Sequence, residues 1–339
     1  MLSVVAHAAR DLRVEDMDAP PAPGPGEVAV DMRVGGICGS DLHYFNHGGV
    51  GANRLKEPMV LGHEAAGVIA AVGPGVAGLD VGQTVAVDPS MPCRVCAQCR
   101  RGRANLCTDM RFNGSAMRFP HVQGLFRGKV VVPAERAVPV ACGPDLAALC
   151  EPFAVCLHAA KRAGPLLGAR VLVAGSGPIG CLTVLAARLA GASEVVVTDV
   201  ADAPLRVASS LGADRAINVA GPGGLDGAGG FDVGFECSGN AGALLGAIGA
   251  LGPGGRLVLV GLGGEVPLPI AAVVPREVEI VGSFRFDDEF ALAARLISSG
   301  RVDPSPLITH ALPLTDALDA FVLAADRGQA MKVQLDLST

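Results

Sequence analysis

The first part of the chain alternates hydrophobic and polar residues in short runs. Glu27–Val34 repeats with a period of two, the pattern of a β-strand with one buried face. Ala65–Val72 and Thr84–Val87 are further expected strands, and Pro-Gly and Gly-Pro pairs at 23–26 and 73–75 mark turns. Short strands at regular intervals, separated by turns, predict a β-rich, barrel-like domain.

The pattern changes near Glu151, where expected strands begin to alternate with helices. This alternation predicts a parallel, doubly wound α/β sheet with right-handed crossovers. We therefore expect one domain over 1–151, rejoined by 284–339, and a second over 152–283. The expected strands of the second domain are Arg170–Ala174, Glu194–Thr198, Ala216–Val219, Phe231–Glu236, Arg256–Val260 and Val278–Gly282, and its expected helices are Ala154–Arg162, 178–190, Pro204–Leu211 and Ala241–Leu251.

The composition excludes several classes of protein. Half of the 339 residues are hydrophobic and the net charge is −6, which excludes a disordered chain. A mildly acidic chain is not expected to bind nucleic acid or an anionic membrane as its main partner. No secretory signal is visible at Met1–Asp18, so the expected location is the cytoplasm. Two uncharged windows, Val171–Ala187 and Cys237–Gly255, contain Gly and Pro and are not expected to span a membrane.

A glycine-rich loop joins an expected strand to an expected helix. In Gly175-Ser-Gly177-Pro-Ile-Gly180, the first glycine permits a tight turn and the second lets the backbone approach a pyrophosphate. Gly180 lets helix and strand pack closely, and the helix N-terminus faces the phosphate charge. Asp199 closes the next strand, where a carboxylate would bind ribose hydroxyls and repel a 2′-phosphate, so NAD is favoured over NADP. The alternative is a glycine-rich turn without a ligand. The expected cofactor-binding residues of the loop are Gly175, Gly177, Pro178, Ile179, Gly180 and Asp199.

Four of the ten cysteines lie within one short segment, with the spacing C-x2-C-x2-C-x7-C. A closed set of four thiolates suits a structural zinc ion. The alternatives are free thiols, an iron–sulfur cluster, or a nucleic-acid-binding zinc module, which usually needs a basic domain around it. The expected ligands are Cys93, Cys96, Cys99 and Cys107.

A second group of metal-type residues, Cys38, His63, Glu64 and Glu151, is scattered, and spacing alone does not distinguish these residues from packed core residues. With the motifs around them, however, the chain resembles the zinc-dependent medium-chain alcohol and polyol dehydrogenases over essentially its whole length. Glu151 is typical of the sorbitol-dehydrogenase-like branch, where it replaces a cysteine. The motifs are GICGSDLH (36–43), GHEAAG (62–67), the four-cysteine segment, Glu151-Pro152, the glycine loop and ECSG (236–239).

The resemblance implies a chaperonin-10-like (GroES-like) catalytic domain, a Rossmann domain, and an active site in the cleft between them. It implies that Cys38 and His63 bind a catalytic zinc ion and that Glu64 and Glu151 complete its sphere directly or through water. Ser40 and His43 match the proton relay, and Asp41 matches the residue that orients His63. The implied reaction transfers a hydride from a zinc-polarised alcohol to the nicotinamide. Ser238 and Arg285 are further expected cofactor contacts.

Within this branch, the likeness is greatest to enzymes that oxidise the sugar acid L-idonate to 5-keto-D-gluconate. It is carried by GICGSDLHY (36–44), PMVLGHE (58–64), NLCTDMRFNGSAMRFPH (105–121) and GSFRF (282–286). A sugar acid needs a donor for its carboxylate, for which Arg285 is the first candidate and Arg111 or Arg118 the second. The other expected substrate contacts are Ser40, Tyr44 and Glu151, with His121 as a weaker candidate that is equally compatible with a structural role.

Two positions depart from the family pattern. Gln83 stands where the family has Asp, which we expect to affect only a surface turn, and Leu125 stands where the family has Gly, which would alter the cleft wall. The alternative functions are a sorbitol-, xylitol- or threonine-type dehydrogenase with the same machinery, and a non-catalytic NAD-binding protein on the same fold. A zinc-free quinone reductase is disfavoured because it would not need Cys38, His63 and Glu151 together. The resemblance also implies a homodimer or homotetramer.

Overall fold

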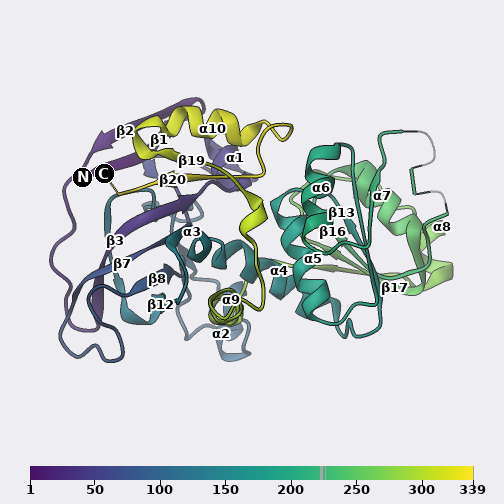
Figure 1. Ribbon diagram of the computed structural model, residues 1–339, viewed down its shortest axis with the longest axis horizontal. Coiled ribbons are helices and arrows are strands. Elements are labelled where there is room, and N and C mark those ends of the chain that lie inside the picture. The colour runs from purple at the N-terminus through teal and green to yellow at the C-terminus, as the bar shows by residue number, and fades with distance from the viewer. Residues whose placement is uncertain (222–223, 226, 339) are drawn as a thin grey trace. The chain divides into compact units, whose positions relative to one another are not determined.

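A computed structural model describes residues 1–221, 224–225 and 227–338 (Figure 1). The chain divides into two compact units. Unit 1 consists of Met1–Glu151, Phe290–Asp326 and the C-terminal segment from Lys332. Unit 2 consists of Pro152–Glu289 and Arg327–Met331. The chain thus re-enters unit 1 at Phe290, later than the expected residue 284, and returns briefly to unit 2 near its end.

Unit 1 is built on a seven-stranded, mostly antiparallel sheet. Its strand order is β12-β8-β7-β3-β20-β19, and β11 also pairs with β3. The long strand β3 is therefore the centre of the sheet, and it ends beside the start of β7, where Gly36 pairs with Glu64. The strands are β3 (Glu27–Gly36), β7 (Glu64–Val72), β8 (Thr84–Val87), β11 (Lys129–Pro133), β12 (Ala137–Pro139), β19 (Ile308–Pro313) and β20 (Lys332–Asp336).

Smaller elements complete unit 1. A three-stranded sheet has the order β2-β1-β6, and two short strand pairs, β4 with β5 and β9 with β10, form hairpin-like extensions. The remaining strands are β1 (Leu2–Ala8), β2 (Asp11–Asp16), β4 (Gly49–Val50), β5 (Asn53–Arg54), β6 (Met59–Val60), β9 (Ser90–Met91) and β10 (Arg111–Phe112). The helices are α1 (Gly39–His47), α2 (Ala97–Arg100), α3 (Pro144–Ala147) and α10 (Ala317–Ala325), with 3-10 turns η1 (Ala104–Leu106), η2 (Ala134–Arg136), η4 (Ser305–Leu307) and η5 (Leu314–Asp316).

The buried ring of Phe126 fixes the segment that carries the candidate ligands. A Cβ atom at Gly35 would lie 2.5 Å from this ring, and one at Gly62 would lie 2.2 Å from it. Gly62 also has a φ of +95°, which a side chain disfavours. The two glycines therefore let β3 and the residue before His63 pack against the same aromatic ring. Leu125 is fully buried, and its N–H donates to Gly62 O. Leu125 thus lies in the core of unit 1.

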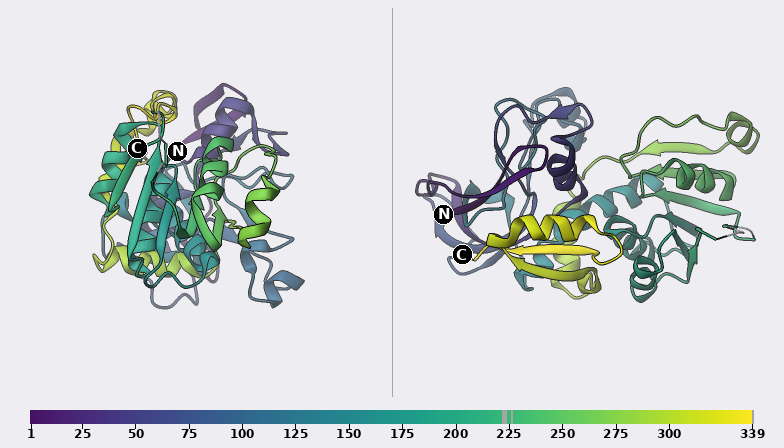
Figure 2. Two further views of the ribbon diagram at one scale, coloured as in Figure 1. Left: turned by 90° about the vertical axis from the view of Figure 1, so that its right-hand side faces the viewer. Right: turned by 90° about the horizontal axis from the view of Figure 1, so that it is seen from above.

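Unit 2 is a six-stranded parallel sheet with the order β15-β14-β13-β16-β17-β18. The chain runs from β13 outward to β15, then crosses back and runs from β16 outward to β18. Right-handed crossovers in two opposite directions place α5 and α6 on one face and α7 on the other (Figures 1 and 2). The strands are β13 (Arg170–Ala174), β14 (Glu194–Asp199), β15 (Arg215–Asn218), β16 (Phe231–Glu236), β17 (Leu251–Leu259) and β18 (Glu279–Gly282).

The helices of unit 2 bury apolar faces against this sheet. Leu172, Val196 and Phe231 belong to one core cluster, with Ile248 of α7 packed on it. The helices are α4 (Cys150–Ala163), which begins at the end of unit 1, α5 (Pro178–Leu189), α6 (Asp202–Ser210), α7 (Ala241–Ala250) and α8 (Ile270–Val273), with η3 (Val274–Arg276). Helix α9 (Glu289–Ser298) begins at the last residue of the long segment of unit 2 and belongs to unit 1 from Phe290 onward. None of the helices in the described parts of the chain is long and apolar enough to cross a membrane.

The structure confirms the expected strands of unit 2 and corrects some of their ends. β13 and β16 have the expected bounds, but β17 begins at Leu251 rather than Arg256. The sequence Gly252-Pro-Gly-Gly255 favours a turn, whereas parallel pairing of Leu251 with Phe231 extends the strand across a register shift. Helix α4 begins at Cys150 rather than Ala154, because a proline is tolerated in the first turn of a helix.

Candidate active site and metal centres

Three of the scattered candidate ligands come together in unit 1. Ligand atoms of Cys38, His63 and Glu64 all lie within 4.8 Å of one another. Cys38 follows β3 as the N-cap of α1, and His63 and Glu64 stand at the start of β7. Because Gly36 pairs with Glu64, the antiparallel register of these strands assembles the cluster.

Asp41, which is fully buried, contacts the segments that carry Cys38 and His63. Its carboxylate accepts the N–H groups of Cys38 at 3.0 Å and Gly62 at 3.2 Å, and it lies 3.6 Å from His63 Nδ1. Ser40 Oγ lies 3.5 Å from the other ring nitrogen, Nε2. With Nδ1 facing a carboxylate, Nε2 is the nitrogen left to bind a metal ion.

The donor set fits a zinc ion. A thiol, an imidazole and a carboxylate are zinc ligands, and three protein ligands leave a position open for a substrate. Burial, reinforced by the nearby Glu64 charge, raises the pKa of Cys38 to about 12. A thiol with so high a pKa stays protonated at neutral pH until a cation displaces its proton, so metal binding and thiol ionisation are coupled at this site.

A buried lysine from the far end of the chain completes the surroundings of Glu64. Lys332 Nζ lies 2.9 and 2.7 Å from the two Glu64 carboxylate oxygens and 3.1 Å from Ile37 O. Burial alone would lower the pKa of Lys332, but the charges of Glu64 and Cys38 raise it above its ordinary value. The sequence contains no local signal for this residue, because Lys332 and Glu64 are 268 positions apart.

Glu151 is buried in the same region but lies outside the compact trio. Its pKa is raised to about 8, mainly by burial, with His63 and Lys332 opposing and Glu64 and Cys38 adding to the shift. The carboxyl is therefore close enough to respond to the charges of the cluster. The structure thus brings Cys38, His63 and Glu64 together as one ligand set, with Glu151 beside it.

The four clustered cysteines form a second centre. Their Sγ atoms lie within 4.8 Å of one another, in the segment between the paired strands β9 and β10. Backbone N–H groups point at the sulfurs, with Cys93 N 3.2 Å from Cys107 Sγ and Cys96 N 3.3 Å from Cys93 Sγ. The N–H groups of Cys99 and Thr108 lower the pKa of Cys96 to about 5. Four convergent sulfurs with N–H donors fit a closed tetrahedral zinc site.

The other expected residues of unit 1 are placed as follows. Tyr44 is buried and its hydroxyl accepts Ala116 N–H at 2.9 Å, which anchors the loop after β10. His43 is exposed on α1, with its ring centroid 5.7 Å from that of His47. Both ring nitrogens of His121 are used, by Lys56 N and Arg118 O, so this residue holds the loop. Arg111 is exposed, and Arg118 pairs with Asp109 at 2.5 Å.

The glycine loop of unit 2 has the geometry of a phosphate site. Gly175 has a φ of +97°, and a Cβ atom on Gly180 would lie 1.8 Å from Gly175 O. A Cβ atom at Gly177 would meet nothing within 4 Å, so this position is open to a ligand at the N-terminus of α5, which begins at Pro178 and includes Ile179. Asp199 accepts Ser176 N at 2.7 Å and Val200 N at 2.7 Å, which fixes its carboxylate beside the loop.

Two expected cofactor contacts are engaged within unit 2. Ser238 Oγ donates to Glu236 at 2.5 Å and accepts Asn240 N–H at 3.0 Å. Arg285 is half-buried at a φ of +54°, with its guanidinium carbon 4.9 Å from the centroid of the Phe284 ring. Glu236, expected only as part of the ECSG motif, is the buried residue on which this loop is organised.

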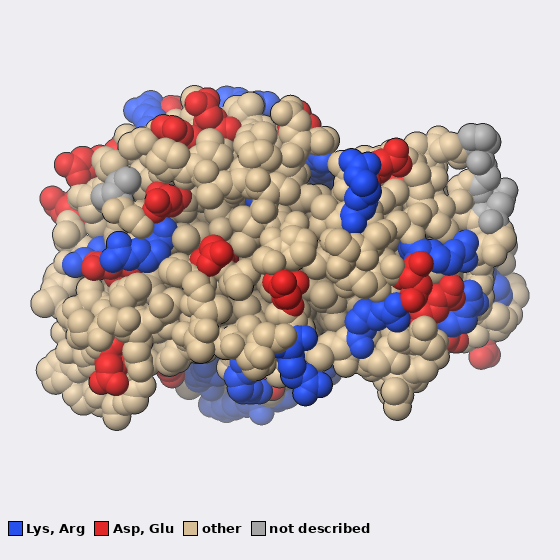
Figure 3. Space-filling model, viewed as in Figure 1, with Lys and Arg blue, Asp and Glu red and all other residues tan. Residues whose placement is uncertain are grey.

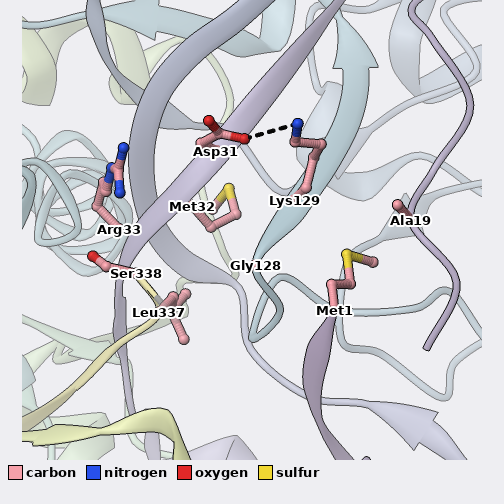
Figure 4. A pocket seen from close by; sticks show the side chains of 9 residues that line it. All are labelled: Met1, Ala19, Asp31, Met32, Arg33, Gly128, Lys129, Leu337 and Ser338. Atoms are coloured by element: carbon pink, nitrogen blue, oxygen red, sulfur yellow. Dashed lines mark ion pairs between the residues drawn. The ribbon is translucent and has the colours of Figure 1, made fainter. Parts of the chain in front are cut away.

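Two further surface features lie outside these centres. A pocket of about 280 Å³ in unit 1 lies among β3, β11 and Met1, and one wall carries the Asp31–Lys129 ion pair of 3.1 Å (Figure 4). None of its lining residues belongs to the two cysteine-containing clusters. On the face drawn in Figure 3, the charged residues lie in several small groups, some of them of mixed sign, on a largely uncharged surface.

Comparison with known proteins identifies the family. Residues 24–142 match the family model described as alcohol dehydrogenase GroES-like domain, and residues 178–299 match zinc-binding dehydrogenase. The chain is 42% identical to L-idonate 5-dehydrogenase (NAD(P)(+)) of Escherichia coli K12, over 90% of each chain. It is 40% identical to sorbitol dehydrogenase of Gallus gallus, over 98% of this chain and 96% of that one.

The likeness extends to solved structures. The crystal structure of L-idonate 5-dehydrogenase from Escherichia coli superimposes with a TM-score of 0.93 at 39% identity, covering 99% of this chain and 97% of that one. An alcohol dehydrogenase from Thermus sp. ATN1 gives a TM-score of 0.86 at 29% identity, covering 99% of each chain. The chain therefore belongs to the zinc-dependent medium-chain dehydrogenases, in their sorbitol-dehydrogenase-like branch.

Proposed function

We propose that this zinc-dependent dehydrogenase oxidises a secondary hydroxyl of a sugar acid, and that L-idonate, giving 5-keto-D-gluconate, is its substrate. The observation that carries the proposal is the buried Cys38–His63–Glu64 cluster, which has the donor set of a catalytic zinc site. The choice of L-idonate rests on the 42% identity to the Escherichia coli enzyme of that name. Sorbitol is the second candidate, because the avian sorbitol dehydrogenase is nearly as similar.

The residues of the proposed active site have different roles in the reaction. Cys38, His63 and Glu64 would hold a zinc ion, which would supply Lewis-acid polarisation of the reacting hydroxyl or carbonyl group. Ser40 accepts the hydroxyl proton at Oγ, and His43 on the exposed side of α1 passes it to solvent. Glu151, which is buried near these residues, would orient the substrate or a water molecule. A nicotinamide dinucleotide supplies the hydride acceptor.

The substrate carboxylate requires a cationic donor, and we assign this role to Arg285. Arg285 is half-buried, and its guanidinium carbon lies 4.9 Å from the centroid of the Phe284 ring, a cation–π contact that favours this position of the side chain. Arg111 and Arg118 are the alternatives. Arg118 is already paired with Asp109, so it is the weaker of the two.

A substrate panel tests the function. Purified enzyme assayed with L-idonate, D-gluconate, sorbitol, xylitol and L-threonine should give the highest kcat/KM for L-idonate. A sugar acid that gains a charged contact should exceed the matching polyol by about 10-fold or more. Rapid sorbitol turnover with no reaction of L-idonate would assign the enzyme to the second candidate instead.

The cofactor is expected to be NAD. Asp199 lies beside the glycine loop, where its carboxylate would accept ribose hydroxyls, and positions 200–204 carry no Lys or Arg that could neutralise a 2′-phosphate. Replacing Asp199 with Ser should raise the KM for NAD by about 10-fold and lower that for NADP, because a charge-assisted contact and a repulsion are both lost. Steady-state kinetics with both cofactors measure this. Asp202→Ser is the matched control, since Asp202 is occupied by the Asn218 side chain, and equal effects of the two variants would contradict the assignment.

A second copy of the chain is the proposed partner. β18 is one of the two outer strands of the described sheet of unit 2, and large apolar side chains in the chain segment before it are exposed, including Leu268 (48%), Ile270 (60%) and Val274 (65%). Light scattering on the purified protein should give two or four times the 34.1 kDa chain mass. A mass equal to one chain at micromolar concentration would contradict the homo-oligomer.

A further inference from the structure

A buried arginine of unit 1 joins the two ends of the segment that carries the four clustered cysteines. Arg136 is 5% exposed and ends the turn η2, after β11. Its Nε donates to Asp88 O at 2.7 Å, and its Nη2 donates to Asn113 Oδ1. Its own carbonyl oxygen accepts Asp88 N–H at 2.9 Å. Asp88 precedes the four cysteines and Asn113 follows them, so one guanidinium fixes the start and the end of the segment.

The Arg136 side chain is charged although it is buried. Burial lowers the pKa of Arg136 to about 10, with the nearby charges of Asp88 and Glu135 opposing the shift, so the guanidinium stays protonated at neutral pH. A buried cation has to find its acceptors within the protein, and hydrogen bonds from a charged donor are stronger than neutral ones. The two acceptor oxygens of Arg136 are therefore held firmly in place.

Asn113 passes this constraint to a second stretch of backbone. It is 7% exposed, and its Nδ2 donates to Gln123 O at 2.7 Å. The side chain of Gln123 in turn accepts Val60 N–H at 2.7 Å. Val60 lies three residues before the candidate ligand His63. A short chain of side-chain bonds thus links Arg136 to the segment that leads into His63.

The residues on either side of Asn113 pack directly on that segment. The ring centroid of Phe112 lies 5.7 Å from that of His63, with the two planes at 53°. Both side chains are only 6% exposed. A Cβ atom at Gly114 would lie 2.7 Å from Gly62 O, so the backbone on the other side of Asn113 touches the residue before His63. The position of Asn113 therefore determines what the imidazole ring packs against.

We infer that Arg136 is a positioning residue for His63 and that it acts through Asn113. By fixing Asn113, the guanidinium keeps the Phe112 ring against the imidazole and so fixes the orientation of a metal ligand. The inference rests on the proposed zinc site of unit 1 but is independent of the substrate and of the dinucleotide. It also gives the two metal centres a common support, because the same guanidinium fixes both ends of the four-cysteine segment.

The test measures how fast each metal ion leaves the holoenzyme. Zinc transfer to a chromophoric chelator should occur in two phases, and the phase that is missing in Cys38→Ser belongs to the Cys38 centre. Arg136→Met removes both donors but keeps an unbranched side chain. Because groups that orient a metal ligand typically change metal affinity by about 10–100-fold, this variant should accelerate the phase of the Cys38 centre by about 10-fold or more.

Arg188→Met is the matched control. Arg188 lies in unit 2 and bonds in the same way, with Nε donating to Gly212 O at 2.7 Å and Nη2 donating to Asp214. Its removal should leave both phases of zinc release unchanged. The thermal midpoint of every variant is measured, so that a general loss of stability is separated from an effect on one centre. An equal acceleration in Arg188→Met would contradict a specific role of Arg136.

A second variant keeps the inference testable if Arg136→Met does not fold. Phe112→Leu leaves the Arg136 bonds intact and removes the ring that packs on His63, so it should accelerate the phase of the Cys38 centre and leave the four-cysteine phase unchanged. An unaltered phase of the Cys38 centre in either folded variant would overturn the inference. Equal zinc contents in Cys38→Ser and the unaltered protein would overturn the proposed zinc site instead.

Discussion

Replacing Lys332 with Met should destabilise unit 1 by about 3–5 kcal/mol in the metal-free protein, because it leaves Glu64 as a buried acid without its partner. Both residues are nearly inaccessible, with side-chain exposures of 3% and 1%. The penalty is the cost of a buried, unpaired charge rather than the value of the ion pair itself. Methionine has a similar length, so lost packing contributes little.

The measurement is urea-induced unfolding of the chelator-treated variants. The double variant Lys332→Met with Glu64→Gln should recover much of the loss, since a neutral amide costs less to bury than a carboxylate. Lys129→Met is the matched control in the same sheet. Its ion pair with Asp31 is 40% and 38% exposed, and its removal should cost less than about 1 kcal/mol.

Zinc should reduce the effect of Lys332→Met, because a divalent ion beside Glu64 replaces the missing positive charge. The single variant should therefore gain more stability from added zinc than the unaltered protein gains. A Lys332→Met protein as stable without metal as the Lys129→Met control would contradict the buried pair. A zinc effect equal in both proteins would place the metal away from Glu64.

The sequence predicted the local parts of this protein better than its long-range contacts. Alternating and apolar runs were sufficient for β8, β13 and β16, since strand pattern depends on neighbouring residues. β17 was predicted too short, because Gly and Pro favour turns and only pairing with β16 overrides them. The glycine loop was predictable because a strand, three glycines and a helix are consecutive in the chain.

The two metal sites also differ in how far local sequence predicts them. The four-cysteine centre was visible from spacing, because its ligands lie within one segment that returns on itself between β9 and β10. The sequence spacing of Cys38 and His63 does not predict that they lie close together, because their proximity depends on the register of β3 against β7. Only the family resemblance predicted that these two residues share a metal site. Lys332 and Glu236 were missed because one belongs to a distant strand and the other acts through backbone N–H groups, which have no sequence signature.

Replacing Cys38 with Ser should lower the zinc content from two ions to one per subunit and reduce kcat/KM by about 1,000-fold or more. A serine hydroxyl does not ionise near neutral pH, so the ligand set loses its only thiolate. Lewis-acid stabilisation is worth several kcal/mol, and each 1.4 kcal/mol is a tenfold change in rate. Metal analysis and steady-state kinetics on the same preparation measure the two effects together.

A loss of zinc can come from either centre, so the identity of the remaining ion must be tested. Cys96→Ser should also leave one zinc ion, but with a lower thermal midpoint and with the Cys38 site still loaded, because it opens the closed four-sulfur site. Cys142→Ser, a half-buried thiol outside both clusters, should keep two ions and full activity. Two zinc ions in Cys38→Ser, or undiminished turnover in a one-zinc Cys38→Ser protein, would remove Cys38 from the reaction.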